Sequence, residues 1–246
     1  MESSVIMESS VITETLPRKL KLLSQNDIYY RFLLEVNQFE EAKVTVIHPA
    51  TQAHLDKYTH QERAFVRETP EVYEKVVGPY VREGPESRLQ WVYNVLEGRS
   101  EAEMVLYADR HPEEGFCILP DSKWDQRNMQ GIYLLVLAMD RRIRTMRDLR
   151  GGHAGMLERM RKEAERVAKE RYGVEGRELK MFVHYMPSYY HFHVHVVRVE
   201  YEDAGTALGK AFLLEDVIDN VNIDGMFYLK KTLCYTLGTE HPLFPL

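Results

Sequence analysis

Residues 191–197, HFHVHVV, constrain the fold more than any other stretch, because histidine and apolar residues alternate along them. Alternation with a period of two predicts a β-strand, in which successive side chains point to opposite faces of a sheet. His191, His193 and His195 would then line one face, and the apolar residues between them would pack into a core on the other. The stretch therefore predicts a row of three imidazoles on a rigid surface.

A row of imidazoles is compatible with three roles. Imidazole gains or loses its charge near pH 7, so the row could supply a nucleophile, a proton donor and hydrogen-bond donors to phosphate. Imidazole is also a common zinc ligand, so the row could hold a metal ion, and a purely structural role is the third alternative. Phosphate chemistry is favoured, because three of the chain's ten histidines fall within five residues and the preceding HYMPSYY adds a fourth histidine and hydroxyl donors.

The stretch also matches the histidine triad motif, His-φ-His-φ-His-φ-φ with φ apolar, at all seven positions. The longer string HYMPSYYHFHVH, which starts at His184, resembles the scavenger mRNA decapping enzymes of the histidine triad superfamily. Four more motifs of this resemblance lie upstream: NDIY at 26–29, QWVYN at 90–94, PDSKW at 120–124 and RTMRDLR at 144–150. The resemblance therefore covers most of the chain.

Composition narrows the class of protein. The 246 residues, 44% of them hydrophobic, can form one large domain or two unequal ones with a proper core. No run approaches about 18 apolar residues and the N-terminus lacks the features of a secretory signal, so we expect neither a membrane span nor export. Cys117 and Cys234 lack paired spacing, which is typical of a reducing compartment, and we expect the cytoplasm, with the nucleus as a second location.

The net charge of −6 bears on the kind of ligand. An acidic protein is repelled by the phosphate backbone, so this charge argues against binding along long duplex nucleic acid. We expect a ligand that is small, or a longer one that the protein binds only at one end.

The order of elements predicts an α+β fold in which helices cover an antiparallel sheet, consistent with a histidine triad-like fold. Short apolar stretches bounded by turn residues predict strands at 103–107, 115–119, 131–139, 179–185, 191–200 and 228–237, and a sheet strand beginning within 89–96. Apolar residues at helical spacing predict a helix at 154–172, which Gly173 would cap, and a second helix at 208–221. A charged stretch over 59–81 is predicted to be a helical linker between the domains.

The resemblance implies two domains. Residues 1–60 would form a small N-terminal domain, including a strand-like stretch at 43–48, that exchanges strands between the subunits of a homodimer and closes over the bound cap. We expect this domain to be shorter than usual, so the extent of the exchange stays open. Its start repeats MESSVI over residues 1–12, which we expect to be disordered. Residues 61–246 would form the catalytic histidine triad domain.

The same resemblance implies a hydrolase that cleaves the triphosphate bridge of 7-methylguanosine-capped dinucleotides or short capped RNA and releases 7-methylguanosine monophosphate. His193 would be the nucleophile that forms a covalent intermediate, His195 would assist the leaving group, and His191 would brace the row. The expected phosphate contacts are His184, Ser188, Tyr189 and Lys123. The expected cap contacts are Trp91, Glu101, Asp121, Asn26 and Tyr29. The resemblance implies no cofactor and no metal.

Three alternatives stay open. The chain could be a cap-binding regulator with weak turnover, another histidine triad hydrolase acting on dinucleoside polyphosphates, or a zinc-binding structural protein. Two further features are assigned to structure. Trp124 is expected to pack in the core, and the arginines of residues 141–150 are expected to form a solvated face or ion pairs.

Overall fold

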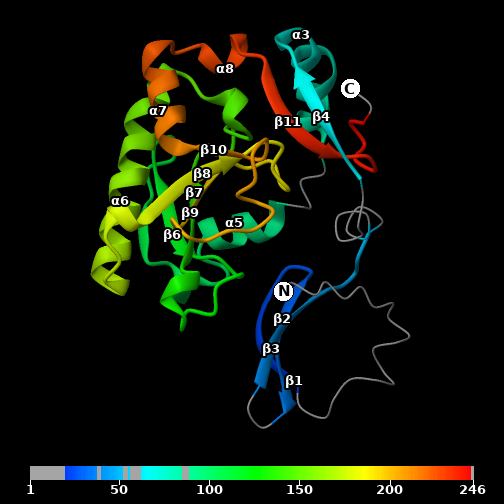
Figure 1. The fold of residues 1–246 in the computed structure, drawn as a ribbon. Coiled ribbons are helices and arrows are strands. Elements are labelled where there is room, and N and C mark those ends of the chain that lie inside the picture. The colour runs from blue at the N-terminus through cyan, green and yellow to red at the C-terminus, as the bar shows by residue number, and fades with distance from the viewer. Residues whose placement is uncertain (1–19, 38–39, 52–54, 56–61, 85–88, 245–246) are drawn as a thin grey trace. The chain divides into compact units, whose positions relative to one another are not determined.

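The computed structural model describes residues 20–37, 40–51, 55, 62–84 and 89–244, and the repeat in residues 1–12 lies outside them (Figure 1). The chain divides into two compact units. The first unit consists of Met1–Glu62 with Gly238–Pro242, and the second of Arg63–Leu237 with Leu243–Leu246. Within the described ranges, no helix combines the length and the apolar character that a bilayer crossing requires.

A three-stranded antiparallel sheet dominates the first unit. Its strands, in order across the sheet, are β1 (Leu20–Asn26), β2 (Tyr29–Asn37) and β3 (Glu40–Ile47). A two-residue turn joins β1 to β2, and its Asp27 has a φ of 53°, a left-handed conformation that aspartate tolerates better than most residues. The strand predicted at 43–48 falls within β3, apart from its last residue.

A six-stranded antiparallel sheet forms the centre of the second unit. The order across it is β10 (Ala211–Leu213), β8 (Leu179–His184), β9 (His193–Arg198), β7 (Tyr133–Ala138), β6 (Phe116–Pro120) and β5 (Tyr107–Asp109). All neighbouring pairs are antiparallel. The predicted α+β class is therefore confirmed, and β9, the strand of the histidines, lies inside the sheet.

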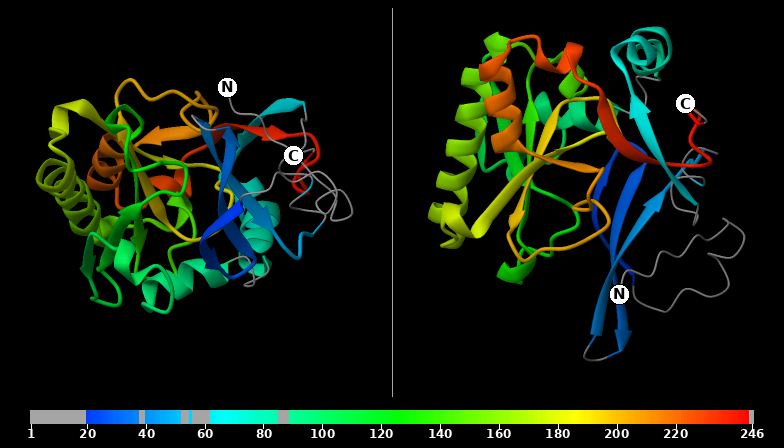
Figure 2. Two further views of the ribbon diagram at one scale, coloured as in Figure 1. Left: turned by 90° about the horizontal axis from the view of Figure 1, so that it is seen from below. Right: turned by 45° about the horizontal axis from the view of Figure 1, so that its top comes forward.

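Helices cover both faces of this sheet. On one face lie α6 (Ala154–Tyr172) and α7 (Leu214–Ile223), and on the other lies α5 (Gln90–Leu96) (Figures 1 and 2). Alternate residues of the strands pack into the two layers. Ile118 and Val136 belong to the layer of α6, whereas Cys117 and Leu135 belong to the layer of α5. The sheet therefore separates two apolar clusters.

The longest helix agrees with its sequence pattern. α6 covers the predicted range, and its buried residues include Leu157, Met160, Ala164 and Val167 at helical spacing. Gly173 follows with a φ of 68°, the left-handed conformation in which glycine ends a helix. Shorter helical turns join the strands: Ala102–Met104, Met129–Gly131, Met146–Asp148, Gly151–His153, Gly176–Glu178 and α8 (Phe227–Lys230).

The helix predicted over 59–81 is wrong over residues 63–68, and residues 59–61 lie outside the described residues. A strand, β4 (Arg63–Glu68), pairs there with β11 (Leu233–Gly238), and the helical part follows as α3 (Pro70–Val72), a π-helical segment (Tyr73–Val77) and α4 (Gly78–Glu83). In β4, Val66 and Glu68 are buried while their neighbours are exposed. This alternation follows the strand period: Arg63 and Arg67 lie on the exposed face, whereas Glu68 lies on the buried one.

Four other predicted elements need correction. The expected strand within 89–96 is the helix α5, which buries Val92, Val95 and Leu96 at helical spacing. The stretch at 103–107 is mostly a helical turn, and only its last residue belongs to β5. The helix at 208–221 begins as β10, and the strand at 228–237 begins as α8. In α5 the burial of these three side chains overrides the local strand propensity.

A buried ion pair connects the strand β4 to the rest of the second unit. Arg147 and Glu68 are both fully buried, with Nη2 of the arginine 2.6 Å from Oε1 of the glutamate. The hydroxyls of Tyr185 and Tyr235 donate to the same carboxylate at 2.7 and 2.8 Å. Arg147 also donates to the carbonyls of Tyr228 and Lys231. The structural role expected for the arginines of 141–150 fits this arrangement.

Candidate active site

The row of histidines lies in the middle of the six-stranded sheet. His193 and His195 of β9 stand opposite Leu137 and Leu135 of β7, which belong to the layer of α5. Directly opposed residues share a face of the sheet, so both imidazoles lie on the α5 face. His191 comes just before β9, and all three imidazoles are buried. The predicted alternation is therefore confirmed within the strand.

The hydrogen bond at Nδ1 of His193 decides where this imidazole carries its proton. Nδ1 lies 2.7 Å from the backbone carbonyl oxygen of His191. A carbonyl can only accept, so Nδ1 donates and Nε2 keeps its lone pair. Burial lowers the pKa of His193 to about 3, although the carbonyl opposes this shift. His193 is therefore a neutral imidazole with a nucleophilic nitrogen at Nε2.

His195 has the opposite arrangement of its two nitrogens. Its Nδ1 lies 3.0 Å from the hydroxyl of Tyr133, and burial raises the pKa of this phenol, which therefore keeps its proton. A phenolic hydroxyl can donate or accept, and in the tautomer in which it donates to Nδ1 the imidazole proton lies on Nε2. The atom Nε2 is buried and has no hydrogen-bond partner among the described residues. His195 can therefore offer an N–H to a group that enters the site.

His191 and His184 flank these two residues. Nε2 of His191 lies 2.7 Å from the carbonyl oxygen of Ala138, to which it donates. Nε2 of His184 likewise donates to the carbonyl of Gly205 at 2.9 Å. Burial lowers the pKa of each imidazole to about 4. Both rings are neutral near pH 7 and are held in one orientation by backbone carbonyls.

The same cluster keeps the metal alternative open. His184, His193 and His195 can each offer a ring nitrogen, and these nitrogens lie within 4.8 Å of one another. Three neutral imidazoles of this kind can bind a borderline metal ion such as Zn²⁺. The geometry thus permits either a metal or a phosphate group, and a chemical test must separate them.

Aromatic rings lead from α5 to His193. The ring of Tyr189 stacks on that of His193 with centres 4.2 Å apart, and Trp91 of α5 meets Tyr189 edge to face at 5.0 Å. The predicted phosphate contact Tyr189 and cap contact Trp91 are therefore next to the triad. Trp124 has a different role: it is buried and its indole N–H donates to the carbonyl of Asn128, as expected for a packing residue.

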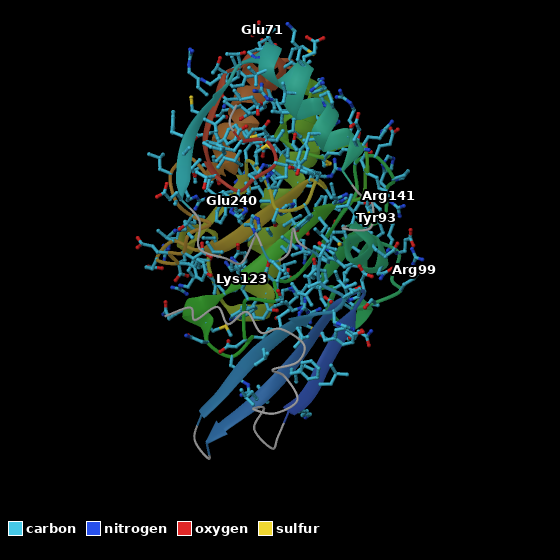
Figure 3. The ribbon with its side chains drawn as sticks, turned by 90° about the vertical axis from the view of Figure 1, so that its right-hand side faces the viewer. Glu71, Tyr93, Arg99, Lys123, Arg141 and Glu240 are labelled. Carbon is cyan, nitrogen blue, oxygen red and sulfur yellow. The ribbon has the colours of Figure 1, made fainter. Side chains whose placement is uncertain are left out.

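Asp121 and Lys123 lie on the turn that follows β6. The backbone N–H of Lys123 donates to Oδ1 of Asp121 at 2.9 Å, which fixes the turn. The Lys123 ammonium, labelled in Figure 3, lies 5.3 Å from the ring centre of Tyr133, the partner of His195. It also forms an ion pair with Asp203 at 3.0 Å. The turn thus brings a cation beside the histidine cluster.

Ser188 and Glu101 lie in connecting segments of the second unit. Ser188 is exposed, one residue before Tyr189. Glu101 precedes the turn Ala102–Met104 and has a φ of 55°. The left-handed region costs a non-glycine residue roughly 1–2 kcal/mol, and such positions are concentrated at ligand sites. Their predicted contacts with phosphate and cap stay predictions.

Asn26 and Tyr29 belong to the first unit, where they face each other at the ends of β1 and β2. Asn26 is buried and Tyr29 is partly exposed. The short turn between these strands therefore brings the two predicted cap contacts of this unit together. Their predicted contact with the cap also stays a prediction.

Three residues near the histidines were not predicted from the sequence. Tyr133 contacts His195, and Asp203 contacts Lys123. Lys210 donates to the carbonyl of Met186, and its charge helps to lower the pKa of both His184 and His193. None of the three lies in a motif of the resemblance. The tertiary structure brings them to the site from separate segments.

Two family models and several curated proteins match this chain. The family model described as scavenger mRNA decapping enzyme C-term binding matches residues 90–209, and the model described as scavenger mRNA decapping enzyme (DcpS) N-terminal matches residues 2–61. The m7GpppX diphosphatase of Mus musculus is 37% identical over 93% of this chain and 68% of its own length. That of Homo sapiens is 35% identical over the same shares. That of Schizosaccharomyces pombe is 37% identical over 91% of this chain and 75% of its length.

Proposed function

The chain belongs to the scavenger mRNA decapping enzymes, which hydrolyse the 7-methylguanosine cap, and we propose that His193 performs this reaction through a covalent intermediate. The observation that carries the proposal is the hydrogen bond from Nδ1 of His193 to the carbonyl of His191. This bond leaves the lone pair on Nε2, and burial keeps the ring neutral. A neutral imidazole with a fixed orientation is a suitable nucleophile for phosphorus.

In the first step, Nε2 of His193 attacks the phosphorus attached to 7-methylguanosine. A bond from nitrogen to phosphorus forms, and the bond from this phosphorus to the bridging oxygen breaks. The nucleoside diphosphate end leaves on that oxygen, which accepts a hydrogen bond from the Nε2–H of His195. The partnerless N–H of His195 and the hydroxyl of Tyr133 behind it support this role.

In the second step, water attacks the phosphorus and the bond to His193 breaks. One proton of the water stays on the new P–OH group, and the other is released to solvent. The product is 7-methylguanosine monophosphate, and the imidazole of His193 returns to its starting form. Dividing the hydrolysis into two displacements gives each step a better nucleophile or leaving group.

Recognition of the cap is proposed for Trp91, with Glu101 and Asp121 accepting hydrogen bonds. A methylated guanine is a planar cation, and stacking on an indole contributes about 0.5–2 kcal/mol through cation–π attraction. The edge-to-face contact of Trp91 with Tyr189 supports this placement next to the nucleophile. His184, Ser188, Tyr189 and Lys123 would hold the phosphates.

The role of the first unit belongs to the same proposal. Asn26 and Tyr29 would contact the cap, and the enzyme would act as a homodimer in the cytoplasm and nucleus. The match of the N-terminal family model to residues 2–61 supports a role for this unit in the proposed enzyme. Light scattering of the purified chain tests the dimer: a mass of twice 28.9 kDa is expected, and a monomer would contradict it.

The central experiment is product analysis. The protein is incubated with the cap dinucleotide m7GpppG, with and without a chelator, and the products are identified by mass. Release of 7-methylguanosine monophosphate in both conditions is expected. Release of the methylated diphosphate would show attack at another phosphate, loss of activity with chelator would favour a metal at the histidine cluster, and binding without cleavage would favour a regulator.

A further inference from the structure

The ion pair between Lys123 and Asp203 joins two segments that are 80 residues apart in sequence. Nζ of Lys123 lies 3.0 Å from Oδ2 of Asp203. The lysine side chain is 45% exposed, whereas that of the aspartate is only 10% exposed. A ligand can therefore reach the ammonium group, but the carboxylate is already in contact with it.

Asp203 is fixed by bonds that do not involve Lys123. Its Oδ1 accepts the backbone N–H groups of Gly205 and Thr206 at 2.7 and 3.0 Å. The hydroxyl of Tyr201 donates to Oδ2 at 3.2 Å. Burial alone would raise the pKa of Asp203, but Lys123 and the two backbone donors outweigh it and hold the pKa below its usual value. The carboxylate is therefore charged near pH 7 and cannot move away with the flexible lysine.

The same turn also reaches the histidine cluster. The carbonyl of Gly205 accepts the hydrogen bond from His184. Gly205 has no room for a side chain, because a Cβ there would lie 2.9 Å from Oδ1 of Asp203 and 3.2 Å from Nε2 of His184. The carboxylate is thus packed close to a predicted phosphate contact, and it places a negative charge where a phosphate chain would pass.

We propose that Asp203 weakens ligand binding by competing with the ligand's phosphate for the ammonium group of Lys123. The inference rests on the proposed function, in which Lys123 holds a phosphate. An anionic ligand can use Lys123 fully only if the ammonium turns away from the carboxylate. The competition weakens the binding of both substrate and product, so it favours release of 7-methylguanosine monophosphate.

Asp203→Asn tests the competition. The amide oxygen of asparagine can still accept the N–H groups of Gly205 and Thr206, but the negative charge at Lys123 is lost. An exposed ion pair is a weak interaction, so we expect KM for m7GpppG and Ki for 7-methylguanosine monophosphate to fall by about two- to fivefold. Both constants should also depend more steeply on salt than in the parent. Circular dichroism checks the fold, and Asp203→Ser is a second variant with a side-chain acceptor.

Two comparisons isolate the pair. Glu202→Gln removes the same charge from the adjacent exposed residue and should leave both constants unchanged. Lys123→Gln removes the cation, and in this background Asp203→Asn should have a smaller effect than in the parent, because the competition no longer exists.

A higher KM in Asp203→Asn would overturn the proposal, because it would mean that the carboxylate merely holds Lys123 in place for the substrate. Equal effects of Asp203→Asn with and without Lys123, or equal effects of Glu202→Gln and Asp203→Asn, would also overturn it. If the parent neither binds nor cleaves the cap dinucleotide, the proposed function itself has failed. If the parent cleaves the cap and the variants match it, only the role of Asp203 is wrong.

Discussion

The imidazole of His193 lies against the ring of Tyr189, with ring centres 4.2 Å apart and planes inclined by 15°. The stack covers one side of the imidazole while its Nδ1 is held by the His191 carbonyl. A nucleophile that is held both by a ring and by a hydrogen bond cannot rotate freely. Little reorganisation is then needed before Nε2 meets phosphorus.

His193→Asn should abolish hydrolysis and preserve binding. Asparagine retains a polar side chain but has no ring nitrogen to attack phosphorus, so we expect turnover to fall by roughly a thousandfold or more. His195→Asn should be slowed but active, because the nucleophile remains and only the hydrogen bond to the leaving oxygen is lost. Product release and equilibrium binding of m7GpppG measure the two effects. Appreciable turnover in His193→Asn, or joint loss of binding and activity in a folded variant, would exclude it as the nucleophile.

Tyr133→Phe should lower kcat by about tenfold with little change in KM. The hydroxyl lies 3.0 Å from Nδ1 of His195, and without it the imidazole proton is free to occupy either nitrogen. Tyr107→Phe is the matched control, since it removes a hydroxyl from the edge strand β5. Steady-state kinetics with the cap dinucleotide compare the two. An equal loss in both variants would show that the effect is not specific to His195.

Trp91→Ala should lose the preference for methylated over unmethylated cap. The charge on the methylated base would no longer meet an aromatic face, and the lost attraction of about 0.5–2 kcal/mol corresponds to roughly a two- to thirtyfold loss of selectivity. Trp91→Phe keeps a smaller ring and should lie between the parent and Trp91→Ala. Competition binding with both caps measures the ratio. Parent-like selectivity in Trp91→Ala would mean that the cap lies elsewhere.

The buried imidazoles should make the folded state sensitive to acid. In the native protein the pKa of His184 and of His191 is lowered to about 4, and that of His193 to about 3, by burial. Below about pH 6.5 the unfolded chain therefore binds protons at these histidines that the native state does not bind. The contribution of these histidines to the free energy of unfolding is fully present above about pH 6.5. It falls as the pH drops toward 4, by at most about 1.4 kcal/mol per pH unit and per histidine.

Urea unfolding at pH 7, 6, 5 and 4 measures this dependence. His193→Asn should show a shallower fall, because it removes one of the groups. Replacement of the exposed His48 by asparagine is the control and should retain the parent's slope. A parent and a His193 variant with the same slope would contradict the prediction.

Glu68→Gln should destabilise the second unit by about 3–5 kcal/mol, because it leaves the guanidinium of Arg147 buried without its counter-charge. Urea unfolding measures the change. Glu74→Gln, at an exposed position of the neighbouring helical segment, is the control and should change the stability little. A loss below about 1 kcal/mol would show that water or another group compensates Arg147.

The elements that could be predicted are those with a clear period. The alternation in residues 193–197 and the helical spacing in 154–172 both correspond to real elements, because their apolar residues face a single core. β4 was not predicted because one of its two buried residues is Glu68, and from sequence alone a glutamate is expected at the surface. Its burial depends on Arg147, Tyr185 and Tyr235, which come from distant segments.

The candidate site divides in the same way. His184, Tyr189, Trp91 and Lys123 each lie in a short motif, and the structure places them near the histidines, while their roles stay predictions. The contacts of Tyr133 with His195 and of Asp203 with Lys123 join positions 62 and 80 residues apart. Nothing in the local sequence marks such pairs, because they arise from strand register and from the turn after β9.

Glu68 and Tyr235 are 167 residues apart, which has a consequence during synthesis on the ribosome. Strands β5 to β9 and helix α6 are complete before β11 has been translated. Until then β4 has no strand to pair with, and the Glu68 carboxylate lacks one of its donors. Closing so long a loop comes late in folding, because its entropy must be lost before the contacts form. The sheet that bears the histidines can therefore assemble first, and β4 takes its final place only after β11 has emerged.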